Sequence, residues 1–207
     1  MEKPWINHPT ILAGPHVDLI PLEEKHFEEL YIAASDKKLW EFIPIDGSDR
    51  EKFNAAYSRS ILDRATGIQY PFVIYHKATK KIIGSTRLFE IYPYDRKLEI
   101  GWTWITRPYW NSAINFECKL LLLTFCFETL KANRVQLKTK DTNIRSRKAI
   151  LKLGARFEGI FRKDRMQDNG IPRNTAYFSI IDEEWENAKT HIENQIAERL
   201  KNKKGVE

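Results

Sequence analysis

The chain has 207 residues, 42% of them hydrophobic and 12% aromatic, and its 34 Lys and Arg against 28 Asp and Glu make the formal net charge +6. This length suits one domain, residues 1–207, and the apolar fraction is large enough to build a core, which excludes global disorder. The N-terminus has no basic segment followed by an apolar one, and the longest apolar run, residues 120–127, is too short to span a bilayer. We therefore expect neither a signal peptide nor membrane binding, and a cytoplasmic location.

An opening strand is predicted over residues 16–22, where apolar residues alternate. A helix follows from Glu23. Ser48 and Glu51 have the spacing of a capping box, which predicts that a second helix starts there. Gly67 is expected to end that second helix.

Three β-rich segments follow, and residues 70–79 and 81–92 are joined by a short polar turn, which favours antiparallel pairing. The third segment covers residues 97–106. The stretch 115–130 is apolar almost all round and predicts a helix buried on most sides. Residues 134–140 form the next strand, and the order strand, helix, strand indicates a parallel crossover.

The C-terminal third carries most of the positive charge. Between Lys131 and Arg173 there are thirteen Lys and Arg but four Asp and Glu, so this segment carries +9 and the rest of the chain −3. A local basic field favours an anionic partner, either nucleic acid or a phosphate-rich small molecule, although a solvated surface has the same composition. The predicted elements here are a helix over 143–153, strands near 155–167 and 172–181 with a turn at 168–170, and a C-terminal helix from Asp182 that continues as a helix and tail over 186–207.

The order of these elements predicts an α/β fold around one mixed sheet. Cys118 and Cys126 lie eight residues apart on one expected helix, about 12 Å along its axis, which is too far for a disulfide. We expect both to be reduced and to pack in the core. The five histidines have no metal-ligand spacing, so no metal is expected.

The strand at 98–105, the loop at 107–115 and the buried helix after it form a pattern that can hold a pyrophosphate. Unpaired N–H groups and the positive end of the helix dipole would both face such a ligand. An ordinary strand-to-helix turn has the same pattern.

A hydroxyl is predicted on the apolar face of the helix over 143–153. With 100° per residue, Ala149, Ile150 and Leu153 fall within about 60° of Ser146. A buried hydroxyl needs a partner there, and a bond back to a helix carbonyl is one possible explanation. Asn143 is a candidate N-cap.

Taken together, these segments resemble the GCN5-related N-acetyltransferase (GNAT) superfamily, and most closely its RimJ/RimL-like branch. The resemblance covers roughly residues 16–185. Its motifs are Glu99-Ile100-Gly101, Asn115-x-Glu117-x-Lys119-Leu120-Leu121-Leu122, Asn143-x-x-Ser146, Lys152-Leu153-Gly154-Ala155, Glu158-Gly159, Gly170-x-x-Arg173 and Tyr177-x-Ser179.

The resemblance implies a mixed, mostly antiparallel sheet of about seven strands whose central parallel strands splay apart. It implies acetyl-CoA as cosubstrate and direct attack by a primary amine of a small molecule or peptide in a ternary complex. It also implies that a homodimer can form. The residues expected to bind acetyl-CoA are Ile100, Trp102, Trp104, Ile105, Trp110, Asn111, Ser112, Ala113, Ile114, Asn115, Asn143, Ser146 and Lys148.

The same resemblance implies the site roles. Ser146 is the candidate acid that protonates the departing thiolate, and a backbone N–H near Trp104 and Ile105 would stabilise the oxyanion. Glu99, at the start of the central strand, is a candidate general base, and a strand-end carboxylate facing solvent is the alternative. Trp40 and Arg87 are expected at the acceptor site.

One motif departs from the family. The pyrophosphate loop of the family is glycine-rich, whereas residues 110–115 contain no glycine. Placing Ala113 in a left-handed conformation would cost about 1–2 kcal/mol, while Asn111 tolerates that conformation better. Two alternatives therefore stay open: a GNAT-fold module that has lost catalysis, and, with less support, a nucleic-acid binder that uses residues 131–173.

Overall fold

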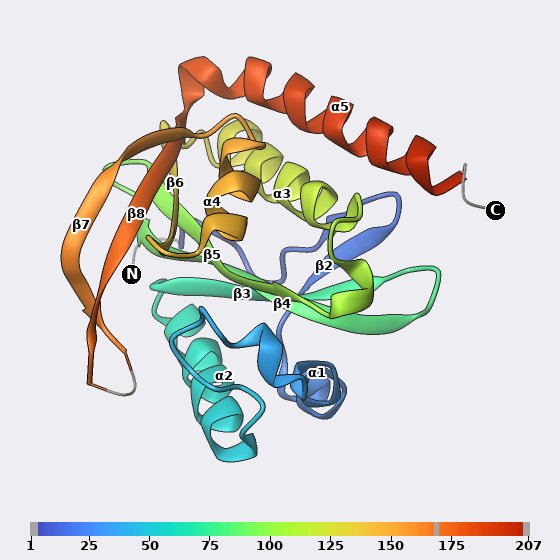
Figure 1. The fold of residues 1–207 in the computed structure, drawn as a ribbon, viewed down its shortest axis with the longest axis vertical. Helices are drawn as coiled ribbons and strands as arrows, with labels where there is room; N and C mark the ends of the chain where they lie inside the picture. Colours follow the sequence, from blue (N-terminus) through green and yellow to red (C-terminus); the bar gives the residue numbers. More distant parts are fainter. Residues whose placement is uncertain (1–3, 168–169, 205–207) are drawn as a thin grey trace.

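The computed structural model describes residues 4–167 and 170–204, and within them the chain forms one eight-stranded sheet with helices on both faces (Figure 1). The strand order is β1-β2-β3-β4-β5-β6-β8-β7, and all neighbours are antiparallel except β5 and β6. The strands are β1 (Leu12–Ala13), β2 (Val17–Pro21), β3 (Gln69–His76), β4 (Lys81–Tyr92), β5 (Lys97–Ile105), β6 (Arg134–Lys140), β7 (Arg156–Met166) and β8 (Pro172–Ile181).

Five α-helices cover this sheet within the described residues. Two of them lie against one face, and α3 and α5 pack on the opposite face (Figure 1). None of the described helices is long and apolar enough to cross a bilayer. The helices are α1 (Phe27–Ala34) and α2 (Arg50–Ala65) on the first face, and α3 (Ile114–Thr124), α4 (Ile144–Leu151) and α5 (Trp185–Lys204).

The expected mixed α/β sheet is confirmed, and so is the parallel pairing of β5 with β6. The predicted start of α2 is wrong by one residue. Its N-cap is Asp49, whose side chain accepts hydrogen bonds from the backbone N–H groups of Glu51 and Lys52, while the Ser48 hydroxyl donates to Asp46 instead. The helix expected over 115–130 also ends early, at Thr124, and a π-helical turn completes it. The predicted turn at Asp168 and Asn169 lies outside the described residues.

The central feature of the sheet is that β5 and β6 pair over three residues and then part. Their register joins Lys97 to Arg134, Leu98 to Val135 and Glu99 to Gln136. Beyond Glu99 the strand β5 keeps only its β4 neighbour, and a bulge interrupts that pairing too. Trp102 sits in this bulge with φ +51°, so the strand turns away from β6 where it would otherwise have continued to pair.

Two apolar cores lie on the two faces of the sheet. The larger packs the sheet against α3 and α5 and includes both free cysteines. The smaller lies under α1 and α2, where Trp40 and Trp104 have ring centroids 5.3 Å apart and the Trp104 indole N–H donates to the Tyr57 hydroxyl at 2.7 Å. The indole of Trp104 therefore anchors the far end of β5 to the α1–α2 layer.

A buried carboxylate ties α3 to the start of β2. Glu117 is 3% exposed, and its Oε1 accepts the backbone N–H groups of His16 at 2.7 Å and Val17 at 3.0 Å. Its Oε2 lies 2.7 Å from the His16 ring. Because β2 begins there, this side chain satisfies backbone donors that no strand partner reaches.

We expect Glu117→Ala to lower the free energy of unfolding by about 2–4 kcal/mol, because it leaves two backbone N–H groups without their acceptor. Glu117→Gln keeps a carbonyl acceptor and should lose less. Denaturant unfolding followed by circular dichroism measures both, with Glu186→Ala, on exposed α5, as the control. Equal stability of Glu117→Ala and the wild type would contradict the assignment.

Candidate active site

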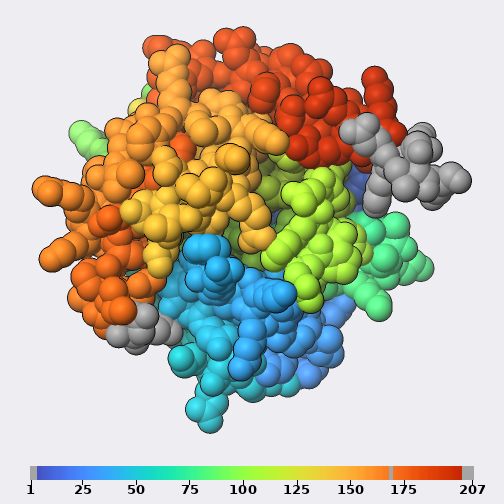
Figure 2. Space-filling model, in the orientation of Figure 1, coloured from blue at the N-terminus to red at the C-terminus, as the bar shows by residue number. Residues whose placement is uncertain are grey.

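A cavity of about 480 Å³ opens where β5 and β6 separate. Its walls come from β5, the loop after β5, α3, α4 and β6, with residues 42–44 from the α1–α2 connection. Single residues of β4, β7, β8 and α5 also line it: Phe89, Arg165, Arg173 and Arg199. In Figure 2 the surface is hollowed where the yellow-green loop near residue 110, the orange-yellow α4 and the blue segment near residue 40 meet. The cavity therefore follows directly from the missing strand pairing.

The β5 residues expected to bind the cosubstrate, Ile100, Trp102, Trp104 and Ile105, all line this cavity. Trp102 is half-buried, while Trp104 and Ile105 are 4% and 6% exposed. Because the register with β6 ends at Glu99, the β6-facing backbone of this segment is available to a ligand.

The loop between β5 and α3 has no glycine, and Asn111 takes the left-handed backbone conformation in it. That residue has φ +58°, whereas Ala113 has φ −66° and carries no strain. Trp110 is fixed from two sides, since its indole N–H donates to the Ile105 carbonyl at 2.7 Å and the Arg145 guanidinium lies 4.0 Å from its ring centroid. The left-handed position thus falls on Asn111, the loop residue that tolerates that conformation better than alanine.

Four of the six loop residues predicted to bind the cosubstrate reach the cavity. Trp110, Asn111, Ser112 and Asn115 line it. The two buried residues Ala113 and Ile114 do not. They begin α3 and pack behind the loop.

The helix α4 presents Asn143, Ser146 and Lys148 to the cavity. Asn143 is the N-cap, as expected, and its Oδ1 accepts the backbone N–H of Ser146 at 3.0 Å. The Ser146 hydroxyl makes no hydrogen bond with any described residue, so it does not bond back to a helix carbonyl. It is half-buried and free to meet a ligand.

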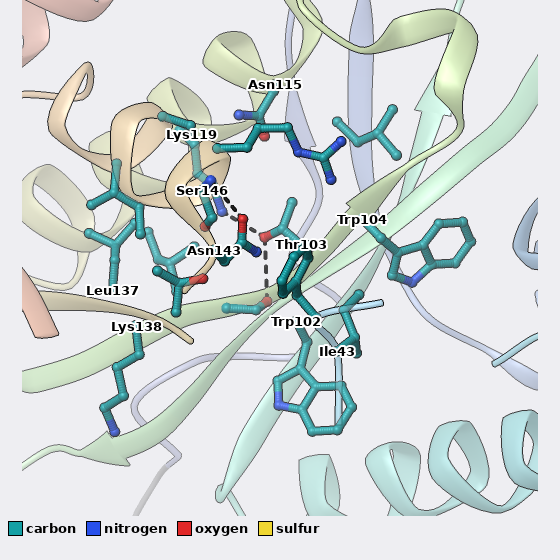
Figure 3. A pocket seen from close by; sticks show the side chains of 18 of the residues that line it. Ile43, Trp102, Thr103, Trp104, Asn115, Lys119, Leu137, Lys138, Asn143 and Ser146 are labelled. Atoms are coloured by element: carbon teal, nitrogen blue, oxygen red, sulfur yellow. Dashed lines mark hydrogen bonds between the residues drawn. The ribbon is translucent and has the colours of Figure 1, made fainter. Parts of the chain in front are cut away.

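Lys119 reaches the same place from α3, as Figure 3 shows together with Asn143 and Ser146. It is 6% exposed, and its Nζ donates to the Thr103 hydroxyl at 2.6 Å. None of the described residues offers it a carboxylate within 4 Å. Burial lowers the pKa of Lys119 to about 8.

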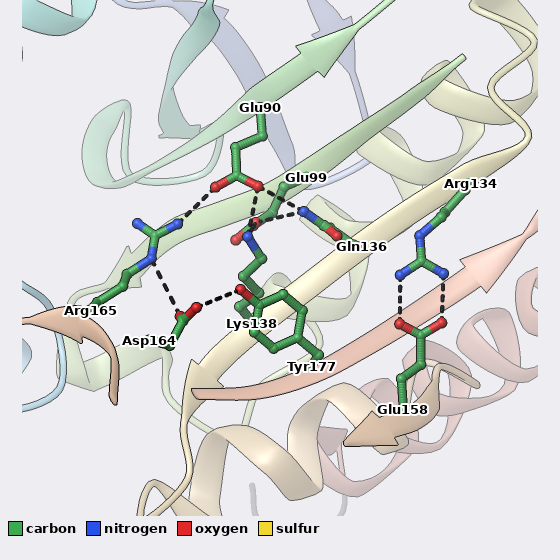
Figure 4. A network of polar contacts seen from close by, with 9 residues as sticks. All are labelled: Glu90, Glu99, Arg134, Gln136, Lys138, Glu158, Asp164, Arg165 and Tyr177. Atoms are coloured by element: carbon green, nitrogen blue, oxygen red, sulfur yellow. Dashed lines mark hydrogen bonds and ion pairs between the residues drawn. The ribbon is translucent and has the colours of Figure 1, made fainter. Parts of the chain in front are cut away.

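On the opposite face of β5, Glu99 belongs to a charged network with Glu90, Lys138 and Gln136 (Figure 4). The Lys138 Nζ lies 2.8 Å from Glu99 Oε2 and 2.6 Å from Glu90 Oε2. Gln136 donates to both carboxylates, at 3.1 and 2.8 Å. Glu90 reaches this point because it occupies a second bulge, with φ +48°.

The two carboxyl groups of this network differ in their pKa. Burial, against the opposing effect of Lys138, raises the pKa of Glu99 to about 7. Burial also acts on Glu90, but the hydrogen bond and charge of Lys138 and the charge of Arg165 outweigh it and lower the pKa. Glu99, which is 3% exposed and lines the cavity, is thus a carboxyl that can exchange a proton near neutral pH and does not face solvent.

Trp40 and Arg87, the two residues expected at the acceptor site, differ in their position relative to the cavity. Trp40 is 5% exposed, donates its indole N–H to the Ala34 carbonyl and does not line the cavity. Its neighbours Phe42 and Ile43 do. Arg87 borders a second hollow of about 360 Å³, which shares three lining residues with the first.

Sequence reasoning missed several polar residues that line these hollows. Lys119 had a visible signal, because it is a cation on a helix that is otherwise apolar all round. The others gave no such signal, since all but Arg199, which lies on α5, sit on alternating or exposed-looking strands. They are Glu90, Thr103, Lys138, Arg165, Arg173 and Arg199.

Comparison with known proteins identifies the family to which this fold and cavity belong. A model of the acetyltransferase (GNAT) domain matches residues 16–156. The "Putative ribosomal N-acetyltransferase YdaF" of Bacillus subtilis (strain 168) is 32% identical over 108 residues, which are 52% of this chain and 58% of YdaF. The chain thus aligns with little more than half the length of that relative.

Two solved structures share the fold. A GCN5-related N-acetyltransferase from Brucella melitensis is 27% identical, with a TM-score of 0.83 over 91% of this chain and 86% of the other. RimJ of Mycobacterium smegmatis, solved in complex with CoA-disulfide, is 21% identical and shares the fold with a TM-score of 0.75, over 91% and 92% of the two chains. Since the family match covers most of the chain and includes the splayed strands, the chain belongs to the GNAT acetyltransferase family.

Proposed function

We propose that this protein transfers an acetyl group from acetyl-CoA to a primary amine of a small molecule or peptide, by direct attack in a ternary complex. The observation that carries the proposal is the placement of two proton-exchanging groups on opposite sides of the splayed strand β5. The carboxyl of Glu99 lies on the α1–α2 side, and the free hydroxyl of Ser146 lies on the α4 side. An amine that attacks a thioester must lose a proton, and the leaving sulfur must gain one.

The cavity fits the proposed cosubstrate. Its volume of about 480 Å³ lies within the usual range of ligand pockets. The unpaired edge of β5 offers backbone hydrogen bonds to an amide-containing arm, and Asn111 with Ser112 borders the start of α3, where an anion is favoured. Four of the cations that line the same cavity suit its phosphates: Arg145, Lys148, Lys152 and Arg199.

Glu99 is the proposed general base. Acetyl-CoA supplies an acyl group activated as a thioester, so the chain must deliver the amine in its uncharged form. A carboxyl with a pKa of about 7 is half ionised at neutral pH and matches that task. Lys138 holds the carboxylate by ion pairing and Gln136 by a hydrogen bond, and both contacts are with Oε2, which leaves Oε1 for the amine.

Ser146 is the proposed acid. Its hydroxyl opens on the cavity, and Lys119 places a buried cation in the same part of the splay (Figure 3). A positive charge near a developing thiolate lowers the energy of the transition state, and burial strengthens that effect. We assign Lys119 to this electrostatic role and Asn143 to holding α4 in place.

The alternatives of the sequence analysis have less support. The left-handed Asn111 removes the main argument for a module that has lost catalysis. Basic residues at α4 line the cavity beside the unpaired edge of β5, which favours a small phosphorylated ligand over nucleic acid. The name of YdaF refers to a ribosomal acceptor and favours a peptidyl amine among the acceptors considered.

We expect Glu99→Gln to lower kcat/KM by about 10²–10⁴-fold and to remove a pH dependence of the wild type. A base must be deprotonated, so wild-type log(kcat/KM) should rise with pH and level off above about 7. Steady-state kinetics over roughly three pH units centred on that value, from pH 5.5 to 8.5, measures the dependence of kcat/KM on pH. Glu158→Gln, whose carboxylate pairs with Arg134 away from the cavity, is the control. An unchanged profile in Glu99→Gln would exclude Glu99 as the base.

Ser146→Ala should lower kcat by about 10²-fold while the dissociation constant of acetyl-CoA stays within about twofold, because the hydroxyl acts on the leaving sulfur and not on binding. Isothermal titration calorimetry measures the dissociation constant, and steady-state kinetics measures kcat. Ser58→Ala, on the exposed face of α2, is the matched control. A wild-type turnover rate in Ser146→Ala would remove this residue from the acid role.

Asn111→Ala should weaken acetyl-CoA binding about tenfold, because alanine at φ +58° costs about 1–2 kcal/mol. Asn111→Gly adopts this conformation freely and should bind at least as well as the wild type. Isothermal titration of both variants tests the loop. Equal affinity in the Ala and Gly variants would mean that the loop binds in another conformation, and no binding by the wild type at millimolar acetyl-CoA would overturn the proposed activity.

A further inference from the structure

Two arginines face each other across the β7–β8 hairpin at the mouth of the larger cavity. Arg165 and Arg173 are direct register partners, and both line the cavity. Like charges directly opposite each other on antiparallel strands are destabilising. A pair of this kind at a cavity mouth therefore needs a compensating negative charge.

Among the described residues, a carboxylate pairs with only one of the two arginines. Arg165 binds Glu90 Oε1 at 2.7 Å, and its Nε lies 3.8 Å from Asp164 Oδ2 (Figure 4). Arg173 has no carboxylate within 4 Å among the described residues. Its Nη1 approaches the Phe42 carbonyl at 3.5 Å, and its Nε is buried without a hydrogen-bond partner.

Arg87 is a second cation without a paired carboxylate among the described residues, and it lies on the same face of the sheet as Glu99. It is 4% exposed, and its Nη1 donates to the Gln69 Oε1 at 2.8 Å. Its guanidinium lies 4.6 Å from the ring centroid of Trp102, and no described carboxylate lies within 4 Å of it. A buried guanidinium without a counter-ion is costly unless a ligand supplies the charge.

The register of β4 and β5 places Arg87 on the same face of the sheet as the proposed base, Glu99. Arg87 pairs with Gly101, and Phe89 pairs with Glu99, so all four side-chain positions share one face of the sheet. Only glycine fits at position 101, because a Cβ there would lie 2.6 Å from the Phe89 ring and 3.3 Å from Glu99 Oε1. The hollow beside Arg87 and the larger cavity share Phe89, Trp102 and Arg165. An amine at Glu99 would thus have an arginine on either side.

We propose that the acceptor amine also bears a carboxylate, which Arg173 and Arg165 bind while the amine meets Glu99. The inference rests on the proposed function and narrows its acceptor class. Arg87 adds positive charge on the far side of Trp102 and disfavours acceptors with a second cation. The carboxylate belongs either to a free amino acid or to an acidic residue next to the N-terminus of a peptide.

Burial and the neighbouring Arg165 charge both lower the pKa of Arg173, as is expected of a cation that lacks an anion. A bound carboxylate would remove that penalty. A planar guanidinium fork also matches a carboxylate better than an ammonium group does, so lysine at this position should serve less well.

The test compares acceptors that differ only in one charge. Glycylglycine against glycylglycinamide probes a free carboxylate, and Ser-Glu-Ala-amide against Ser-Gln-Ala-amide probes an acidic peptide. The wild type should prefer the acid of one pair by about tenfold in kcat/KM, mainly through KM. Arg173→Gln should lose this preference and Arg173→Lys should keep part of it. Arg162→Gln, on the exposed face of β7, should keep it in full.

A second readout does not depend on turnover. The N-acetylated acid and its amide are titrated into the protein saturated with CoA, and the acid should bind about tenfold more tightly to the wild type but not to Arg173→Gln. If acetyl-CoA binds and amines are acetylated, but acids and amides behave alike or Arg173→Gln keeps the preference, this inference is overturned and the proposed function stands. If no amine of the panel is acetylated, the proposed function itself fails. The thermal unfolding midpoint of each variant shows that it is folded.

Discussion

The separation of β5 from β6 after Glu99 is the constraint on which the other features of the site depend. A parallel pair at the centre of a sheet normally runs its full length, and here it stops after three residues because a bulge at Trp102 turns the strand. The backbone groups released in this way have to be satisfied by something other than a strand. The cavity, its lining and its ligand chemistry all follow from that gap.

The gap also lets two layers of the protein act on one point from opposite faces. Lys119 and Ser146 reach it from the α3–α4 layer, while Glu99 on β5 and Lys138 on β6 reach it from the face of the sheet that α1 and α2 cover. Neither set could meet the other across a continuous sheet. The proton-exchanging groups can therefore be tuned separately, each by its own neighbours.

This arrangement has an energetic cost, which falls on the buried charged groups near the gap. Glu99 has a raised pKa and Lys119 a lowered one, in both cases chiefly through burial, and Arg173 and Arg87 lack counter-ions among the described residues. Groups that are costly in the unliganded fold are concentrated around one cavity, whereas ion pairs elsewhere, such as Arg134 with Glu158, are complete. Such clustering is typical of sites in which ligands supply the missing partners.

The sequence by itself determined the order of the elements, the parallel crossover and the cap of α4 by Asn143, because periodicity and capping are local. It misplaced the start of α2 by one residue, since Ser48 and Asp49 are both good caps and only the packed chain selects between them. Tertiary structure alone decided that Trp40 packs in the core while its neighbours line the cavity, that Glu90 reaches Glu99 through a bulge, and that Arg165 opposes Arg173. These depend on strand register and on bulges, which bring together residues far apart in the chain and leave no local pattern.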